Sequence, residues 1–494
     1  MRGSMLVCLL VVAFALPAAA ADDPDNLPWS LENVLSRVPP LKNDAAGRLP
    51  MITWPPFVID ADDRTWADGA PLDDSAYREL ARRGLAPHIP CFNEKYIEMA
   101  KAIQGAGCPV IMMEGAAGNG PGGDAEDALH RLPEDYKLQQ GEIRFVCPLL
   151  EDGWKIRQGK IVQALQKYKA AGVTVDAIWL DWEVEPYAGK RQWAQSGVCP
   201  RCRRMFPKGV LDEFNLYATF VHQARARLFS TYVARPILDV FPACSTTNWT
   251  AVYSSVDRPT PSWCADRLTP PTDIGALTAS NPVAYGNDAL YRMHWKASWG
   301  WPLDGGHMDR LYTYVMLAQV SANAANQLRT AGGKQTVPWV CRYCPDDGDP
   351  NVPILSRPRY REILRHVWLR GATTMQIFNH PRPPRGTIAI EELQDAVAVY
   401  DEMLAHRAFL DGGQVMNTAG FEPTWDGAIW SGLRLADRAL VRAFTMAERP
   451  VEFQLVPFQA AASEKVDLTA PPQGATYLLQ RDSGRIVVRR LPSP

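Results

Sequence analysis

The sequence lacks the charge imbalance that marks proteins with charged macromolecular partners. Its 494 residues carry 52 Lys and Arg against 54 Asp and Glu, a formal net charge of −2, and no long basic run. This balance argues against nucleic acid or an anionic membrane surface as the main partner. Beyond the N-terminus, no apolar stretch is long enough to predict a membrane span. The length allows one large domain and a smaller one.

Several motifs of common enzyme classes are also missing. No G-x-S-x-G turn is present, which argues against a serine nucleophile. A metal-dependent hydrolase would have to use His88, His294 or His380, but no H-x-H or H-E-x-x-H spacing supports one. The glycine-rich segment 118–123 lacks the Lys-Ser/Thr ending of a phosphate-binding loop. We therefore predict no cofactor and no metal in the active site.

The N-terminus has the pattern of a secretory signal peptide. Arg2 is followed by an apolar run from Met5 to Leu16 and by the small-residue segment 17–21. We predict a signal peptide over residues 1–21, and hence a secreted or periplasmic protein.

The cysteines leave three possibilities open. Ten are present, and Cys8 lies in the predicted signal peptide. Cys199–Cys202 and Cys341–Cys344 are both C-x-x-C pairs, which together could form a four-thiolate zinc site. The second pair lies partly in a predicted strand, where positions i and i+3 face opposite ways. A local disulfide or free thiols at Cys199 and Cys202 is therefore favoured over zinc outside the cytoplasm.

Short apolar runs alternate with amphipathic helical patterns between residues 47 and 410. After a linker and leading helix over 22–46, we predict a (β/α)8 TIM-type barrel of the α/β class. An open doubly wound sheet is the alternative, but the first strand is not followed by a glycine-rich loop. The predicted strands are 51–57, 85–91, 109–114, 144–149, 175–183, 243–249, 337–343 and 373–379. The predicted helices are 93–104, 154–171, 213–233, 308–329, 359–370 and 391–410, with Gly84, Gly107, Gly172 and Gly371 as C-caps.

After residue 411 the pattern changes to short alternating runs. These predict strands at 428–433, 439–446, 451–457, 476–480 and 485–489, with a turn at Asp482-Ser483-Gly484. We expect a small antiparallel β domain over residues 411–494, either as a structural cap or as a glycan-binding module.

The predicted strand Val175–Glu183 carries an unusual pair of carboxylates. Strand alternation places Trp179, Asp181 and Glu183 on one face. Two neighbouring carboxylates at the end of a buried strand are costly unless one is protonated or well partnered. This arrangement favours a general acid with a helper carboxylate over a structural ion-pair site.

Active sites of such barrels lie at the C-terminal ends of the strands. The predicted strand ends are rich in carboxylates, which supply acid and base, and in aromatic rings, which suit sugar faces. A further aromatic loop, 281–301, follows Trp249, and contributes either carbohydrate contacts or loop packing. Beside Asp181 and Glu183, the candidate substrate-binding residues are Trp54, Glu114, Tyr187, Trp249, Tyr285, Tyr343, Asp346 and Asn379.

The Asp176–Glu183 segment resembles the strand signature of family-18 chitinases, Asp-Gly-x-Asp-x-Asp-Trp-Glu. Asp176, Asp181, Trp182 and Glu183 match, whereas Trp179 stands in place of the middle Asp. The Asp-Trp-Glu core is also similar to family-56 hyaluronidases, and Val283-Ala284-Tyr285 resembles the Met-x-Tyr element of chitinases. Separately, the segment Cys199–Phe206 resembles a Cys-Pro-x-Cys-x-x-x-Phe element of bacterial barrel hydrolases.

These resemblances imply an exported glycoside hydrolase acting on a polysaccharide or oligosaccharide, with amino-sugar polymers as the implied substrate. Glu183 would protonate the glycosidic oxygen, and Asp181 would orient the substrate acetamido group, whose oxygen is the nucleophile. Tyr285 would hydrogen-bond that oxygen. Two alternatives remain open. Glu183 could pair with a distant carboxylate such as Asp346 or Glu114, or the barrel could bind carbohydrate without catalysis.

Overall fold

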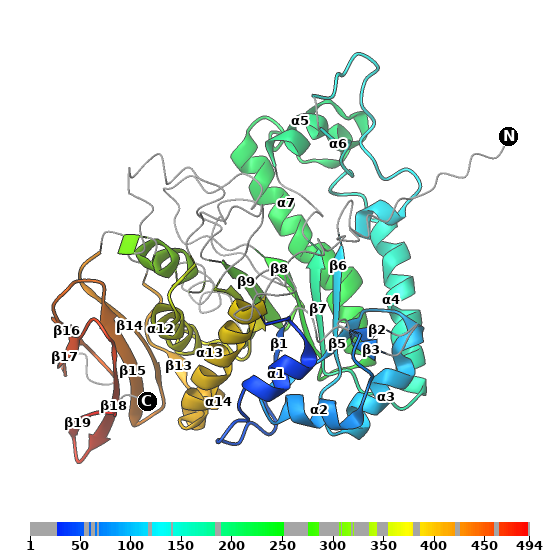
Figure 1. Ribbon diagram of the computed structural model, residues 1–494. Coiled ribbons are helices and arrows are strands. Elements are labelled where there is room, and N and C mark those ends of the chain that lie inside the picture. Colours follow the sequence, from blue (N-terminus) through cyan, green and yellow to red (C-terminus); the bar gives the residue numbers. More distant parts are fainter. Residues whose placement is uncertain are drawn as a thin grey trace.

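Short parallel strands form the centre of the computed structural model (Figure 1). The structure describes residues 27–53, 59–60, 65–66, 69–116, 121–139, 142–182, 189–250, 275–285, 306–307, 309–317, 320, 335–342, 354–378, 386–419, 425–458 and 464–492. The parallel strands are β1 (Met51–Thr53), β4 (Leu85–Ala86), β5 (His88–Pro90), β6 (Ile111–Ala116), β7 (Ala177–Trp182), β8 (Ser245–Thr250), β9 (Ala279–Tyr285), β10 (Gln335–Thr336), β11 (Trp339–Cys341) and β12 (Gln376–Ile377).

The pairing of these strands returns to its starting point. β1 lies between β12 and β4, whereas β5 pairs with β6. A single residue, Pro87, separates β4 from β5, so the two are halves of one strand. Pairing then continues through β7, β8, β9 and β11 back to β12. The α/β class is confirmed, and this is the strand order expected of a (β/α)8 barrel.

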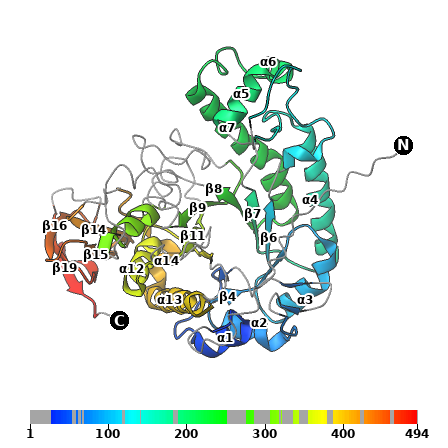
Figure 2. The same cartoon turned by 45° about the horizontal axis from the view of Figure 1, so that its top comes forward.

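Helices cover the outside of the sheet (Figure 2). Buried apolar residues of α2, α3, α4, α12 and α13 form one large cluster with outward-facing strand residues such as Ile178 and Leu180. At the four predicted C-cap glycines φ is positive, between 67° and 93°, which confirms these helix ends. The helices are α1 (Leu31–Arg37), α2 (Asp74–Ala81), α3 (Ile97–Gly105), α4 (Asp152–Ala170), α5 (Lys190–Val198), α6 (Pro200–Met205), α7 (Phe214–Phe229), α8 (Arg235–Val240), α12 (Arg357–Trp368), α13 (Gly386–Leu404) and α14 (Arg407–Gly412), with 3-10 turns η1 (Glu94–Tyr96) and η2 (Pro121–Asp124) and a π turn η3 (Ser230–Ala234).

Two predicted elements of the barrel were wrong. The apolar run 144–149 is not a sheet strand, and its one ladder contact is an isolated antiparallel bridge between Val146 and Leu129. Its buried residues Cys147 and Leu149 pack among helices instead, which accounts for the apolar pattern. Residues 281–285, which the sequence predicts as part of a loop, belong to β9 between β8 and β11. This strand is hard to predict from the sequence because it contains Asn281 and Pro282, and neither residue type favours strands.

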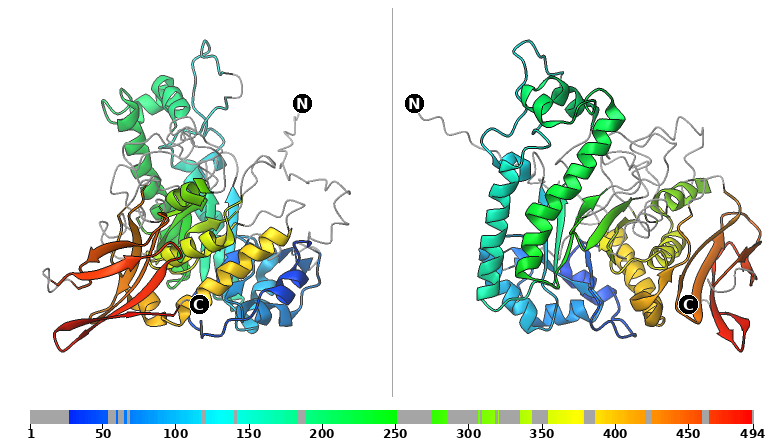
Figure 3. Two further views of the ribbon diagram at one scale, coloured as in Figure 1. Left: turned by 60° about the vertical axis from the view of Figure 1, so that its left-hand side comes forward. Right: turned by 180° about the vertical axis from the view of Figure 1, so that it is seen from behind.

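The C-terminal residues form antiparallel sheets beside α12 (Figure 3). A larger sheet has the order β13 (Gln414–Val415), β14 (Ala428–Arg434), β15 (Arg438–Thr445), β18 (Ala475–Asp482) and β19 (Arg485–Arg490). β16 (Val451–Leu455) pairs with β17 (Val466–Ala470), and a small hairpin near the N-terminus joins β2 (Ile59–Asp60) to β3 (Thr65–Trp66). The β18–β19 turn has positive φ at Ser483 and Gly484, as its sequence predicts.

A buried polar cluster joins α12 to the C-terminal sheet. Arg442 of β15 forms an ion pair with Glu362 of α12, and both side chains are at most 6% exposed. Nε2 of His366 lies 3.3 Å from the Glu362 carboxylate, and its Nδ1 lies 2.8 Å from Oγ of Ser431. Burial by itself would raise the pKa of Glu362, but hydrogen bonds with His366 and Arg442 outweigh it and lower that pKa to about 2. Burial lowers the pKa of His366 to about 4.

Both shifts predict that acid destabilises the protein. The folded state holds His366 neutral and Glu362 ionised, so the unfolded state takes up more protons as the pH falls. His366 should lower the stability as the pH falls from 6.5, the ordinary histidine pKa, to about 4. Glu362 should lower it further below pH 4.5, the ordinary carboxyl pKa. His366→Gln should therefore flatten the upper part of this decrease. The measurement is the urea midpoint between about pH 7 and about pH 4, and His307→Gln is the control. An identical profile in wild type and His366→Gln would contradict the prediction.

Candidate active site

The barrel interior is defined by alternate residues of the strands. Ala177 and Trp179 of β7 belong to a small buried cluster that also includes Met113 and Trp339, whereas Ile178 packs against the outer helices. Asp181 follows two positions after Trp179 and therefore occupies the interior register at the C-terminal end of β7. The alternation predicted for this strand is confirmed for its described part.

Three other candidate residues lie on described strands. Tyr285 ends β9, is half-buried, and stacks on Phe378 with ring centroids 5.2 Å apart. Trp249 of β8 pairs with Asn281 of β9, at the same end of the sheet. Glu114 of β6 is paired with Leu180 and alternates with the interior residue Met113. Glu114 therefore occupies a position on the outer face of the sheet, which the helices cover.

The remaining candidates lie outside the described residues. They are Trp54, Glu183, Tyr187, Tyr343, Asp346 and Asn379. Their assignment to the site stays a prediction, as does that of Asp181, Glu114, Trp249 and Tyr285, for which the structure gives the strand position. The structure brings Asp181, Trp249 and Tyr285 to the C-terminal ends of the neighbouring strands β7, β8 and β9.

An aromatic wall continues from Tyr285 across the next strands. Phe378 follows β12, and its ring meets that of Trp339 edge-on with centroids 5.9 Å apart. The pairing of β11 with both β9 and β12 places these three aromatic residues side by side. Sequence reasoning did not include Trp339 or Phe378 among the candidate residues. A signal was present, since both lie in apolar runs that predict strands.

Polar groups are buried in the barrel beside this wall. Among the described residues, no hydrogen-bond partner is present for Nε1 of Trp179, Oγ1 of Thr247 or either side-chain amide atom of Gln376. Buried polar atoms are generally hydrogen-bonded to protein, water or ligand. Burial also lowers the pKa of His88 to about 4, so this imidazole is neutral near pH 7. The barrel interior therefore contains buried polar groups that carry no charge near pH 7.

Asp176, which directly precedes β7, is held in place by a backbone contact. Its carboxylate accepts a hydrogen bond of 2.8 Å from the backbone N–H of Val110. Burial raises the pKa of Asp176, and this hydrogen bond opposes that shift. The residue precedes β7, so it lies at the opposite end of the strand from Asp181.

Cys341 does not lie with Cys199 and Cys202, and Cys344 lies outside the described residues. Cys341 belongs to β11 of the barrel, whereas Cys199 and Cys202 lie in a separate cluster around α5, α6 and α7. The four-thiolate site that we considered is therefore wrong. Cys199 and Cys202 are instead accompanied by Cys147 and His130, all four buried. In the described part of the chain, this group alone gathers three or more His, Cys, Asp or Glu side chains in a geometry that could hold a metal ion.

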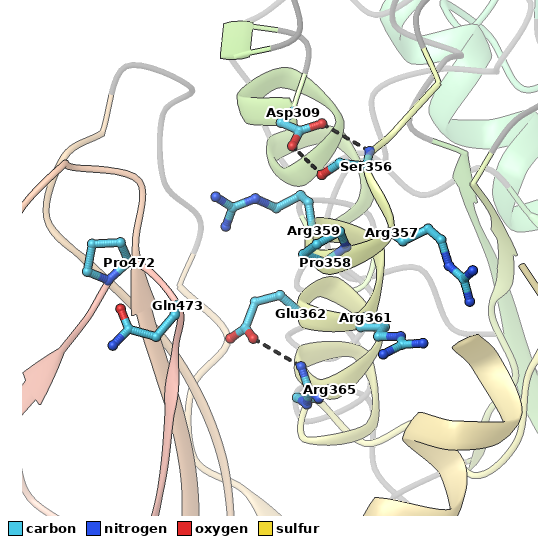
Figure 4. A pocket seen from close by; sticks show the side chains of 10 residues that line it. All are labelled: Asp309, Ser356, Arg357, Pro358, Arg359, Arg361, Glu362, Arg365, Pro472 and Gln473. Atoms are coloured by element: carbon cyan, nitrogen blue, oxygen red, sulfur yellow. Dashed lines mark hydrogen bonds and ion pairs between the residues drawn. The ribbon is translucent and has the colours of Figure 1, made fainter. Parts of the chain in front are cut away.

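A cleft of about 560 Å³ lies between α12 and the C-terminal sheet (Figure 4). Its arginines are largely neutralised, since Arg357 lies 2.8 Å from Asp395 and Arg365 lies 2.9 Å from Glu402. We regard it as part of the interface that holds the C-terminal sheet. Its lining residues are Asp309, Ser356, Arg357, Pro358, Arg359, Arg361, Glu362, Arg365, Pro472 and Gln473.

No family model and no curated protein matches the chain. Solved structures that superpose on this chain include an α-amylase from H. orenii. It gives a TM-score of 0.44 at 10% identity, and the match covers 88% of this chain and 99% of that chain. A trehalose-6-phosphate hydrolase from Bacillus licheniformis gives a TM-score of 0.43 at 10% identity over 89% of this chain and 100% of that chain. A GH27 β-L-arabinopyranosidase from Geobacillus stearothermophilus gives 0.43 at 8% identity over 93% and 98%. These neighbours are glycoside hydrolases, and similarity at this level carries no argument about this chain.

In the part of the chain that the structure describes, no helix is both long and apolar enough to cross a membrane.

Proposed function

We propose that this chain is an exported glycoside hydrolase with its active site at the C-terminal ends of the barrel strands. The observation that carries the proposal is the register of β7, which gives Asp181 an interior position at the end of that strand. Glu183, two residues further along, is proposed as the general acid. Asp181 is proposed as its helper carboxylate.

The aromatic wall supports carbohydrate as the substrate class. The rings of Tyr285 and Phe378 stack on each other and are half-buried, whereas Trp339, which meets Phe378 edge-on, belongs to the buried cluster next to them. Flat aromatic faces pack well against the apolar faces of sugar rings, and Tyr285 adds a hydroxyl group. Polysaccharides or oligosaccharides containing amino sugars are the proposed substrates, because of the Asp-Trp-Glu resemblance.

The proposed mechanism divides the work between the carboxylates. The Glu183 carboxylic acid donates its proton to the glycosidic oxygen as the bond to the anomeric carbon breaks. The acetamido oxygen of the substrate attacks that carbon, while Asp181 and Tyr285 orient the acetamido group. Water then hydrolyses the cyclic intermediate and returns a proton to Glu183. A nearby negative charge and a dry aromatic surround both favour a protonated acid.

The test is a hydrolysis screen over glycans that compares the wild type with Glu183→Gln. Loss of a general acid should lower turnover by about 100-fold or more while glycan binding persists. Asp176→Asn is the matched control, because Asp176 lies at the other end of the same strand and the amide oxygen can still accept from Val110. This control should retain activity. Unchanged turnover in Glu183→Gln would overturn the assignment, and a wild type that binds glycans without hydrolysing any would favour a binding barrel.

A further inference from the structure

A lobe with its own small core projects from the barrel. It contains residues 121–139 and 142–150, which follow β6, and helices α5, α6 and α7, which follow β7 (Figure 1). Its buried residues form a cluster separate from the main core, with Phe206 stacked on Tyr217 at 5.5 Å. Two loops that follow neighbouring barrel strands therefore meet in one unit.

A short antiparallel ladder brings His130 next to Cys147. The backbone N–H of His130 donates to the carbonyl of Phe145 over 2.8 Å, and that of Cys147 donates to Ala128 over 2.9 Å. Nδ1 of His130 then lies 3.3 Å from Sγ of Cys147. Backbone pairing thus holds together two side chains that lie 17 positions apart in the sequence.

Cys199 and Cys202 lie at the start of α6, next to His130 and Cys147. Cys199 is the N-cap residue, Pro200 occupies the first turn, and Cys202 lies one helical turn further on. Sγ of Cys202 lies 3.3 Å from Nδ1 of His130, and Sγ of Cys199 lies 3.8 Å from Sγ of Cys147. The three thiols are free, with no disulfide among them.

We propose that His130, Cys147, Cys199 and Cys202 bind a zinc ion. The four ligand atoms lie within 4.8 Å of one another, and each residue is at most 1% exposed. A tetrahedral zinc with Zn–S near 2.3 Å and Zn–N near 2.0 Å sets its ligand atoms about 3.5–3.8 Å apart. The distances of 3.3, 3.3 and 3.8 Å therefore need only small shifts to accommodate the ion.

The groups around the ligands complete a metal site. Nε and Nη2 of Arg201 lie 3.3 and 3.1 Å from Sγ of Cys147, and the backbone N–H of Arg131 donates to Sγ of Cys199 over 3.2 Å. A zinc ion with three thiolates carries one net negative charge, which the guanidinium of Arg201 offsets. Oγ of Ser196 lies 3.5 Å from Nε2 of His130 and can orient the ring.

Four protein ligands close the coordination shell, which identifies the zinc as structural. It would tie the loop that follows β6 to the helices that follow β7, so both connections above the candidate active site share one anchor. The proposal does not rest on the proposed glycosidase activity. Its readout is metal content and the integrity of the lobe.

The test is elemental analysis of the full-length protein, purified without metal-affinity resin or chelator. We expect a single zinc ion per chain in the wild type and loss of most of it in Cys199→Ser. Cys244→Ser is the matched control, because Cys244 is also buried but packs in the main core; it should retain the zinc. Substoichiometric metal in the wild type, a disulfide among these thiols in mass spectrometry, or equal loss in both variants would overturn the proposal.

A second measurement covers the case in which Cys199→Ser does not fold. Cobalt exchanged into the wild-type protein should give thiolate charge-transfer bands and the intense visible bands of tetrahedral coordination. Addition of zinc should abolish these bands, since both ions compete for the same ligands. A spectrum of octahedral cobalt, without thiolate bands, would overturn the proposal independently of any variant.

Discussion

Replacing Arg442 by methionine is expected to lower the free energy of unfolding by about 3–5 kcal/mol, because the buried carboxylate of Glu362 would lose its closest cationic partner and keep only the contacts with His366 at 3.3 Å and Arg365 at 3.4 Å. Arg442 donates to this carboxylate from Nε at 2.8 Å and also from Nη2. Its Nη1 donates to Thr476 over 3.1 Å, so one side chain joins β15, β18 and α12. The measurement is chemical denaturation of the wild type and the variant near neutral pH.

Arg489→Met is the control for loss of an arginine, because Arg489 is exposed on β19 and should tolerate the change with little effect. The double variant Arg442→Met/Glu362→Leu gives a second comparison. It should be less destabilised than the sum of the two single variants, since neither partner of the Arg442–Glu362 ion pair is left buried without the other. Full additivity would show that the ion pair does not contribute as described.

Gly474→Ala should destabilise the same interface by about 3–5 kcal/mol, a loss similar to breaking the buried ion pair. Gly474 has φ +77°, and an added Cβ would overlap Nη2 of Arg442 and lie 2.6 Å from Oε1 of Glu362. Both atoms belong to the buried ion pair, in which Nη2 of Arg442 donates to Oε2 of Glu362 and Nε donates to Oε1, so either atom can move away only by disturbing these hydrogen bonds. Denaturation midpoints of the variant and the wild type measure the loss.

The chain contains a close control for this substitution. Gly484 has φ +81° in the β18–β19 turn, and a Cβ added there would meet nothing within 4 Å. Gly484→Ala therefore carries the left-handed backbone cost of about 1–2 kcal/mol without the steric conflict. The difference between the two variants isolates the contact with the ion pair. Equal losses would mean that backbone strain alone accounts for the effect at Gly474.

Much of the barrel could be predicted because its signals are local. Gly84, Gly107, Gly172 and Gly371 end helices through their own backbone conformation, and the strands that follow are apolar runs. The errors arose where tertiary context overrides local pattern. Val146 is apolar because the lobe buries it, not because a sheet does, and β9 tolerates Pro282 within a buried strand.

The candidate site was accessible to sequence reasoning only in part. Strand alternation was sufficient to assign Asp181 to the same face as Trp179, because residues two positions apart on a strand share a face. The aromatic wall was missed because Phe378 and Trp339 meet through strand pairing that no local pattern reveals. The partners of Cys199 were missed for the same reason. Cys147 lies 52 residues earlier in the sequence, and the ladder that places it there is too short to predict.

The pairing of β1 with β12 has a consequence for the order of folding. Ile52 pairs with Gln376, so the ring of strands cannot close until more than three quarters of the chain is available. The segment before β1 depends on the same late part, because the backbone N–H groups of Lys42 and Asn43 donate to Asp401 of α13. Contacts of such long sequence separation form slowly, since loop closure must precede them. During synthesis β1 can pair with β4 early, but its other edge stays unpaired until β12 is made, and the nascent chain must remain protected until this last barrel strand arrives.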